Sequence, residues 1–419
     1  MASINSPLRR RTTCRLCDSR ALELAVPLAA SPIADAFVPK ARVGQPQACY
    51  PLDLYLCSEC GHVQNLDVVD PAELFRDYLF TTGSSGGLVG HFRNYAEALV
   101  QRFSIAPDRL VVEVGSNDGT LLGFFKGHGL RALGIDPARE IARQATGNGI
   151  ETLPDFFGSS LARQIRRERG GAALVCANNV FAHSDDLADI AQGVREVLAD
   201  DGVFVFEVSY LVDIVDGLLF DTVYHEHVSY HSVAPLDRFL KRHGLELFDV
   251  ERIASKGGSI RGFAQRRPEG RRSISPIVGD LMALEKRRGF DRAGIYTDFS
   301  ARINGHKAAL AGFVDAERAQ GRTFVGYGAS TTTTTLMWQF DLTKKLAFVA
   351  DDNSKKHGLF TPGCHLPVVA SEELYSQRPD VVVILAWQYA TQIISKHARY
   401  LASGGRFAVP LPELKIVGG

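Results

Sequence analysis

The sequence lacks an excess of charge of either sign and lacks any long uninterrupted apolar run. Lys and Arg together number 47, as do Asp and Glu, so the formal net charge is zero. Non-specific nucleic-acid binding relies on a positive field, and a membrane span needs about 20 continuous apolar residues. Arg9-Arg10-Arg11 leads into a cysteine pair and not into an apolar signal-peptide core. We therefore expect a soluble cytoplasmic protein with neither a nucleic-acid nor a membrane partner.

Cysteine is also scarce, and its seven copies are unevenly placed. Four of them form two Cys-x-x-Cys pairs, which can supply four thiolates to one tetrahedral zinc ion. The alternative, two redox dithiols, lacks a thioredoxin-like βαβ context around either pair. We expect a structural zinc held by Cys14, Cys17, Cys57 and Cys60, with no open position for catalysis. His62 is expected to be a neighbour of this site and not a ligand.

A glycine-containing turn follows the first strand of an α/β pattern. The expected strand Leu110–Val114 runs into Gly115-Ser116-Asn117-Asp118-Gly119-Thr120, and the next strand ends at Asp136. Glycines let such a turn approach a ligand closely, and an acid after the second strand can accept both ribose hydroxyls. The G-x-G-x-x-G spacing of a dinucleotide site is absent, so another kind of nucleotide site or a merely structural turn remains open.

Polar residues also follow the next two expected strands. The strand Ala173–Ala177 leads into Asn178 and His183, and the strand Gly202–Val208 leads to a run of histidines at 225, 227 and 231. Ligands of open α/β sheets gather beyond the carboxyl ends of the strands. We therefore expect all of these segments to meet at one crevice.

The histidine run is Tyr224-His225-Glu226-His227-Val228-Ser229-Tyr230-His231. Such a run suits either a metal or acid/base chemistry near neutral pH, and a metal on His225 and His227 would need a third ligand that the sequence does not show. A regular strand would direct these two histidines to one face and their neighbours to the other, so four inward side chains would require an irregular segment. His225 is expected to be a helix-end or core histidine, and His231 with Ser232 is expected to start a helix whose amides the hydroxyl caps.

The order of these motifs resembles the sugar C-methyltransferases that build branched deoxysugars on nucleotide carriers. Glu113-Val114-Gly115-Ser116-Asn117-Asp118-Gly119 resembles the first motif of class I S-adenosylmethionine (SAM)-dependent methyltransferases. The resemblance spans nearly the whole chain. Its other motifs are the two cysteine pairs, Asp77–Gly83, Tyr224–His227, Lys256–Arg261, Gly326–Ser330, Asp351–Asn353 and Thr361–Gly363.

The resemblance implies an α/β protein of three parts. Residues 1–72 would form a zinc-binding domain, 73–275 a class I SAM methyltransferase domain with a Rossmann-like sheet, and 276–419 a helical connection and a second Rossmann-like domain. The implied SAM-binding residues are Glu113, Gly115, Asn117, Gly119, Asp136, Asp155, Phe156 and Asn178. In the family, Glu113 and Gly115 would flank the methionine moiety, Asp136 would hold the ribose, and Asp155 with Phe156 would lie beside the adenine.

The implied substrate is a TDP-4-keto-deoxyhexose that is methylated at a carbon beside the keto group, C3 in preference to C5. Methylating carbon needs a carbanion equivalent, and the ketone makes the neighbouring C–H acidic enough for a side-chain base. We expect His227 to be that base, because neutral imidazole suits physiological pH. Glu226 would orient it or donate a hydrogen bond to the ketone, and Tyr224, Tyr78 and His183 would stabilise the enolate oxygen or hold the sugar.

One segment departs from the family pattern. Thr331–Thr335 replaces a stretch where relatives often carry Lys or Arg and Asn. Threonine can hydrogen-bond phosphate but supplies no positive charge, so the nucleotide stays open. Trp387 and Tyr389 follow a strand and are expected either to touch ligand or to pack.

Two other functions compete with this prediction. A methyltransferase acting on oxygen or nitrogen of another metabolite would need no carbon acid, so solvent deuterium would not enter a substrate C–H bond. A non-catalytic or RNA-directed zinc-ribbon protein is disfavoured by the neutral charge and by the absence of basic runs between the cysteine pairs. Three domains can enclose a site within one chain, which is compatible with a monomer.

Overall fold

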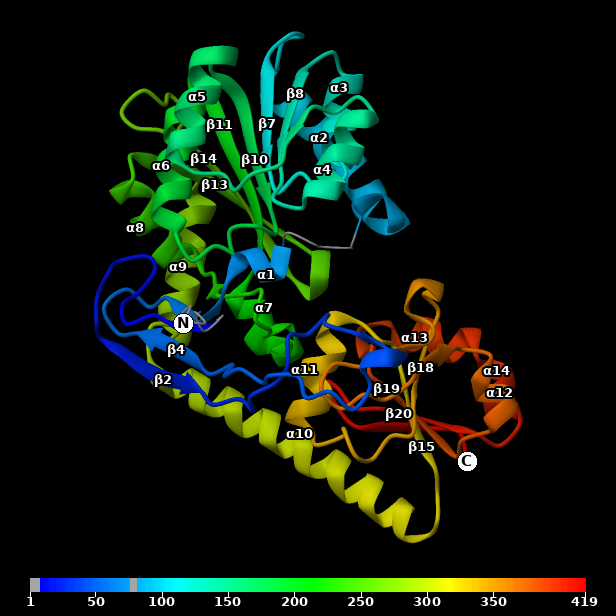
Figure 1. Cartoon of the computed structure of the whole chain (residues 1–419). Helices are drawn as coiled ribbons and strands as arrows, with labels where there is room; N and C mark the ends of the chain where they lie inside the picture. The colour runs from blue at the N-terminus through cyan, green and yellow to red at the C-terminus, as the bar shows by residue number, and fades with distance from the viewer. Residues whose placement is uncertain (1–7, 76–80) are drawn as a thin grey trace, which may run out of the picture.

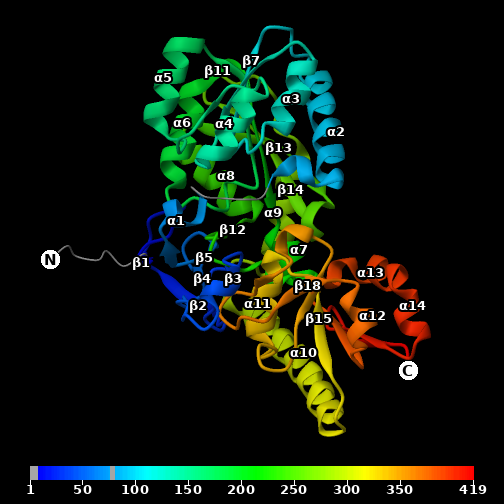
Figure 2. The same ribbon diagram turned by 45° about the vertical axis from the view of Figure 1, so that its right-hand side comes forward.

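The computed structural model describes residues 8–75 and 81–419. In Figure 1 a central domain lies at the top, an N-terminal module at the lower left and a C-terminal domain at the lower right. The long helix α10 (Ala293–Ala319) runs beneath the N-terminal module and leads to the C-terminal domain, and Figure 2 shows its far end projecting from the molecule. In the described parts of the chain no helix is long and apolar enough to cross a membrane.

The central domain is built on a seven-stranded sheet of order β13-β14-β11-β10-β7-β8-β9. Its strands are β7 (Leu110–Val114), β8 (Arg131–Ile135), β9 (Thr152–Leu153), β10 (Ala172–Asn178), β11 (Leu198–Ser209), β13 (Leu245–Ile253) and β14 (Ser259–Arg266). Strands β7 to β11 are parallel, and β14 is antiparallel to both of its neighbours. Every residue of β7 and β10 is buried, as expected for strands covered on both faces. The predicted class I methyltransferase sheet is confirmed.

Helices cover both faces of this sheet. They are α2 (Gly86–Arg102), α3 (Thr120–Gly127), α4 (Arg139–Gly147), α5 (Ser159–Arg169), α6 (Leu187–Val197) and α8 (Val233–Arg242). Figure 1 shows α5 and α6 on one side and α2 and α3 on the other. Successive residues of a strand point to opposite faces, so Val112 packs in the core on the α5–α6 side and Val111 in the core on the α2–α3 side.

Helix α8 begins after Ser232, as predicted, but its cap differs from the prediction. The Ser232 hydroxyl makes no capping hydrogen bond. The amides of Val233 and Ala234 instead donate to the two carboxylate oxygens of Glu285, at 2.7 and 2.9 Å, from helix α9 (Pro276–Arg288). His231 is fully buried in front of the helix, which agrees with a structural role. A carboxylate from a distant helix thus replaces the local cap.

The N-terminal module contains an antiparallel sheet of order β12-β5-β4-β2. Three of its strands are local, namely β2 (Leu22–Val26), β4 (Leu54–Cys57) and β5 (Val63–Asn65). The fourth, β12 (Ser229–Tyr230), is the end of the histidine run and pairs with β5. The module also contains β1 (Leu8–Arg10), β6 (Asp67–Val69), α1 (Pro71–Phe75) and β3 (Val38–Pro39), and β3 pairs with β17 (Leu359–Phe360) of the C-terminal domain. Strands of the N-terminal module therefore pair with strands from both of the other domains.

The C-terminal domain has a six-stranded sheet of order β18-β16-β15-β19-β20-β21. Its strands are β15 (Phe324–Tyr327), β16 (Val349–Asp351), β18 (Val368–Ala370), β19 (Val381–Ile384), β20 (Arg406–Val409) and the antiparallel β21 (Lys415–Val417). Its helices are α11 (Thr331–Gln339), α12 (Glu373–Gln377), α13 (Ala390–Lys396) and α14 (Ala398–Ala402). The predicted second Rossmann-like domain is present.

The threonine run occupies the first turns of α11 and joins all three domains. The hydroxyl of Thr333 donates to the carbonyl of Gly328 at 2.6 Å, within the domain. Thr334 donates to the carbonyl of Ala34 in the N-terminal module at 2.7 Å, and Thr335 to the carbonyl of residue 223 in the central domain at 2.8 Å. These three hydroxyls therefore bind backbone within the protein.

Candidate functional site

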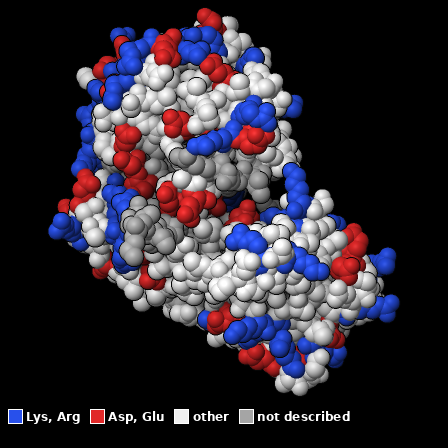
Figure 3. Space-filling view, in the orientation of Figure 1, with Lys and Arg blue, Asp and Glu red and all other residues white. Residues whose placement is uncertain are grey.

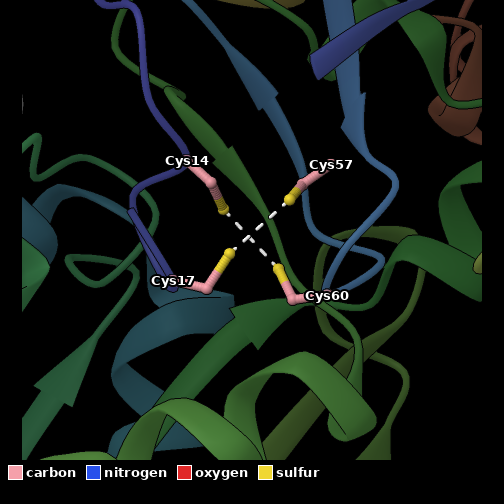
Figure 4. A group of neighbouring side chains, drawn as sticks. All are labelled: Cys14, Cys17, Cys57 and Cys60. Carbon is pink, nitrogen blue, oxygen red and sulfur yellow. Dashed lines mark hydrogen bonds between the residues drawn. The ribbon is translucent and has the colours of Figure 1, made fainter. Parts of the chain in front are cut away.

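The four paired cysteines point toward one spot (Figure 4). Their sulfur atoms all lie within 4.8 Å of one another, with 3.6 Å between Cys14 and Cys60 and between Cys17 and Cys57. A tetrahedral zinc with Zn–S bonds of about 2.3 Å needs sulfurs about 3.8 Å apart, so the cluster fits that ion. These four residues therefore suit a structural zinc ion. His62 lies beside it, and its Nε2 is 3.3 Å from the hydroxyl of residue 229.

The first zinc knuckle also positions an arginine that reaches the central domain. Arg15, next to Cys14, is buried, and its Nε donates to the Asp185 carboxylate at 2.9 Å. Arg11 donates to the Asp185 backbone carbonyl at 3.0 Å. Asp185 lies two residues after His183, so the zinc module holds the loop that carries this histidine.

A cavity of about 500 Å³ lies at the carboxyl edge of the central sheet. The predicted site residues in its lining are Glu113, Gly115, Asn117, Asp136, Asp155, Phe156, Asn178, His183, Tyr224, Glu226 and His227. Gly119 lies outside the lining and serves as the N-cap of α3 at φ 77°, where a Cβ would come within 2.9 Å of Ile150. Tyr78 lies outside the described residues. Figure 3 shows that the surface is hollowed between the central and C-terminal domains, with charges of both signs around the hollow.

The glycine turn is held against the end of the second strand. The Asp136 carboxylate accepts hydrogen bonds from the backbone amides of Asn117 and Ala138, each at 2.8 Å. Gly115 has φ 70°, and a Cβ there would lie 2.3 Å from a methyl group of Val180. Glycine is therefore required for the backbone to pass this close to the wall of the cavity.

Several buried polar atoms of the lining have no protein partner. Among the described residues, Oε2 of Glu113 has no hydrogen-bond partner, and neither do the side-chain oxygen and nitrogen of Asn178. Glu113 is only 3% exposed and Asn178 only 8%. Burying a polar atom without a partner costs about 1–3 kcal/mol, so these atoms fit a polar ligand. Burial raises the pKa of Glu113 well above its ordinary value, with the nearby Asp136 and Asp118 adding to the effect. The exposed ring of Phe156 lines the same cavity. The residues present thus fit the amino acid, ribose and adenine of SAM.

The histidine run forms a turn where it meets the cavity. The amide of His227 donates to the carbonyl of Tyr224 at 2.8 Å, and the segment is irregular. Tyr224, Glu226 and His227 therefore reach one cavity, which a regular strand would forbid. His225 points elsewhere, with its Nε2 3.2 Å from the carbonyl of Tyr50.

His227 is held in one tautomer by a backbone carbonyl. Its Nδ1 lies 2.7 Å from the carbonyl of Thr222, which only accepts, so the proton sits on Nδ1 and Nε2 keeps its lone pair. Burial lowers the pKa of His227 to about 4, with a further contribution from Lys256 and an opposing one from Thr222. The rings of Tyr224 and His183 lie 4.1 and 4.8 Å from its own. The imidazole is therefore neutral at physiological pH.

The carboxyl group beside it behaves differently. Burial raises the pKa of Glu226 to about 7, with Asp35 adding to the rise and Lys256 opposing it. Both its protonated and its ionised form are populated near neutral pH. Burial also lowers the pKa of His183 well below its ordinary value, so this imidazole is neutral as well. The cavity thus offers a neutral base next to a carboxyl group that can donate or accept a proton.

The C-terminal domain anchors the segment that orients His227. Trp387, after β19, donates from Nε1 to the Asp221 carboxylate at 2.8 Å, and Thr335 donates to the carbonyl of Val223. Asp221 and Val223 flank Thr222, whose carbonyl holds the imidazole of His227. Trp387 therefore packs and bonds within the protein, whereas the neighbouring Tyr389 is 63% exposed.

Sequence reasoning assigned no site role to Lys256, which also lines the cavity. The sequence pattern that could have pointed to Lys256 is a cation followed by two glycines, between the segments that form β13 and β14. Asp221, Thr222 and Trp387 were missed as a group because they come from two domains, and no sequence spacing links them.

Comparisons with known proteins agree with this arrangement. Three families match successive parts of the chain: a putative zinc binding domain over residues 14–75, a methyltransferase domain over 89–250 and a C-methyltransferase C-terminal domain over 254–412. The chain is 33% identical over 405 residues to C-methyltransferase NovU from Streptomyces niveus, covering 96% of both proteins.

Solved structures resemble less than half of the chain, and only distantly. The PH0226 protein from Pyrococcus horikoshii is 14% identical, with a TM-score of 0.37 and coverage of 47% of this chain and 99% of that one. Magnesium protoporphyrin IX methyltransferase from Synechocystis, solved with SAM, is 15% identical, with a TM-score of 0.32 and coverage of 43% and 81%.

Proposed function

The chain belongs to the family of SAM-dependent C-methyltransferases, and from that premise we propose that its substrate is a nucleotide-linked 4-keto-deoxysugar. We further propose TDP as the carrier and C3 as the methylated carbon. The observation that carries the proposal is one cavity that joins the glycine turn to a neutral histidine and a carboxyl group of raised pKa. Such a pair suits removal of a proton from carbon next to a ketone.

Proton removal is assigned to Nε2 of His227. The Thr222 carbonyl keeps the other nitrogen protonated, so the lone pair is available at every pH above about 4. Glu226 is assigned to the ketone, where its protonated form donates a hydrogen bond to the oxygen that gains charge. Tyr224 and His183, whose rings flank His227, would hold the sugar in place.

SAM supplies an electrophilic methyl group on a sulfonium when it is bound. Glu113, with its unpartnered Oε2, and Asn178 are assigned to the polar groups of its methionine and ribose portions. Asp136 would accept the ribose hydroxyls beside the two amides it already holds. The exposed ring of Phe156 would cover the adenine, with Asp155 next to it.

The test is incubation of the protein with SAM and a panel of nucleotide-linked 4-ketohexoses, followed by mass spectrometry and NMR of the product. A methyl group on C3 is expected, and a methyl group on oxygen or nitrogen would refute the proposal. A methyl group on C5 would refute only the choice of carbon.

His227→Asn tests the assignment of the base. The amide cannot take up the proton, so we expect turnover to fall by about 100-fold or more while SAM affinity stays unchanged. In D₂O without SAM, the wild type should exchange the substrate C3 hydrogen and the variant should not. His225→Asn is the matched control, because that histidine lies outside the cavity. Equal exchange in His227→Asn and wild type would contradict the assignment.

A further inference from the structure

The turn between β13 and β14 carries a lysine into the cavity. Lys256 has φ 53° and ψ 35°, a left-handed conformation, and Gly257 and Gly258 follow with φ 84° and 131°. The left-handed conformation is unfavourable for a residue with a side chain, because Cβ then lies too close to the following carbonyl oxygen. It persists only where surrounding contacts hold it, and such positions cluster at functional sites.

Close packing holds this turn in place. A Cβ on Gly258 would lie 2.4 Å from Cβ of Asp213 in helix α7 (Leu211–Asp216), and a Cβ on Gly257 would lie 2.8 Å from Leu219. The carbonyl of Ser255 accepts hydrogen bonds from the Gly258 amide and from the hydroxyl of residue 259, each at 3.0 Å. Both glycines are needed for this packing, which sets the position of the Lys256 backbone.

The lysine belongs to the same cavity wall as the acid–base group. Lys256, Glu226 and His227 all line the cavity. The charge of Lys256 lowers the pKa of Glu226 and of both cavity histidines, His183 and His227. Side chains from two separate segments, 183 and 226–227, therefore feel the charge of one ammonium in the same cavity.

Among the described residues, this ammonium has no hydrogen-bond or ion-pair partner. Within residues 8–75 and 81–419, Lys256 forms neither a hydrogen bond nor an ion pair, whereas the other basic residue of the lining, Arg9, pairs with Asp185. The Lys256 residue keeps exposed surface, yet desolvation by the protein around it lowers the pKa of its ammonium, with Glu226 and Glu207 opposing that effect. A cation held in this way is available to an anion that forms on a ligand.

We propose that Lys256 is a catalytic residue whose ammonium stabilises the enolate oxygen of the substrate. When the base takes the C3 proton, the electron pair of that C–H bond forms the C3–C4 double bond and the carbonyl pair moves onto oxygen, beside Lys256. When the new bond from C3 to the methyl carbon forms, the oxygen pair restores the ketone and the pair of the broken sulfur–carbon bond stays on sulfur. This step rests on the proposed keto-sugar function.

The experiment compares Lys256→Met and Lys256→Gly with wild type. Both variants remove the ammonium, and the glycine variant also relieves the left-handed strain, so the two together separate charge from backbone effects. Removing one oxyanion partner lowers kcat about 100- to 1000-fold, and we expect that loss in both variants with KM changed less than about threefold. Exchange of the C3 hydrogen in D₂O without SAM should fall in proportion. Added ethylammonium should restore part of the activity of Lys256→Gly.

The remaining measurements separate this role from others. Lys344→Met, an exposed lysine of the C-terminal domain, is the control and should behave as wild type. If Lys256→Met keeps wild-type exchange of the C3 hydrogen, the lysine does not stabilise the enolate and the inference is wrong. The inference is also wrong if the variant keeps kcat but binds free TDP more weakly, because the lysine then binds the diphosphate. Absence of exchange in the wild type would refute the proposed function instead.

Discussion

Replacing Trp387 with Phe removes the hydrogen bond by which the C-terminal domain holds the Asp221 side chain. The indole donates to the carboxylate at 2.8 Å, and Asp221 and Trp387 are 1% and 9% exposed. The next residue, Thr222, supplies the carbonyl that fixes the tautomer of His227. The substitution should therefore affect both stability and turnover.

The magnitude depends on the charge of Asp221. Burial raises the pKa of this carboxyl group to about 7, although the bond from Trp387 opposes the rise. Below that pH the bond is neutral and contributes about 1 kcal/mol, and above it the bond to a carboxylate contributes about 1.5–3 kcal/mol. The loss in Trp387→Phe should therefore grow from about 1 kcal/mol at pH 6 to about 2 kcal/mol at pH 8.

Denaturant unfolding at the two pH values measures this loss, and steady-state kinetics measures its effect on His227, the proposed base. Trp338→Phe is the matched control at the only other tryptophan of the sequence. The indole nitrogen of Trp338 has no hydrogen-bond partner among the described residues. A displacement of about 1 Å at a catalytic group can cost up to about 100-fold, so we expect kcat of Trp387→Phe to fall roughly tenfold with SAM affinity unchanged. Equal stability and turnover of the two variants at pH 8 would refute the reasoning.

Two further predictions concern pH and metal. The folded-state pKa of Asp221, about 7, lies above its unfolded value of 3.8, so the stability it contributes is full below pH 3.8 and is lost as the pH rises through 7. The unfolding free energy of the wild type should therefore fall between pH 5 and pH 8, and Asp221→Asn should remove roughly 2–3 kcal/mol of that fall. The part that is due to Glu226 should remain. If the variant and the wild type lose the same free energy over this range, the raised pKa of Asp221 is contradicted. Removing zinc with a chelator, or replacing Cys17 with Ser, should lower the melting temperature and kcat together, because the knuckle holds Arg15 against Asp185; zinc-free protein with full activity and an unshifted melting curve would overturn this link.

Much of the central domain could be predicted from local patterns. The strand Leu110–Val114 has the predicted bounds, and the glycine turn follows it as expected, because a buried parallel strand and a tight turn each require particular residues in sequence. The four cysteines could be predicted for the same reason, since each knuckle is a local structure. The predicted acid–base pair of Glu226 and His227 lies in one cavity with the glycine turn.

Other features depend on contacts that no local pattern records. Glu285 caps α8 from another helix, although a serine stands at the cap position. The sequence left open whether the threonine run hydrogen-bonds phosphate, but Thr334 and Thr335 donate to carbonyls of two other domains. The partners of the two threonines lie 300 and 112 positions away in the sequence, and the partner of the α8 amides lies on a separate helix.

The sequence by itself therefore determined the elements, the zinc ligands and the chemical types gathered at the edge of the sheet, because these follow from periodicity and short-range spacing. Only the tertiary structure decided that His227 faces the cavity and His225 does not, because that choice comes from an irregular turn held by β12 on one side and by the C-terminal domain on the other. Burial, which raises the pKa of Glu226 and lowers that of His227, arises from the same packing of three domains.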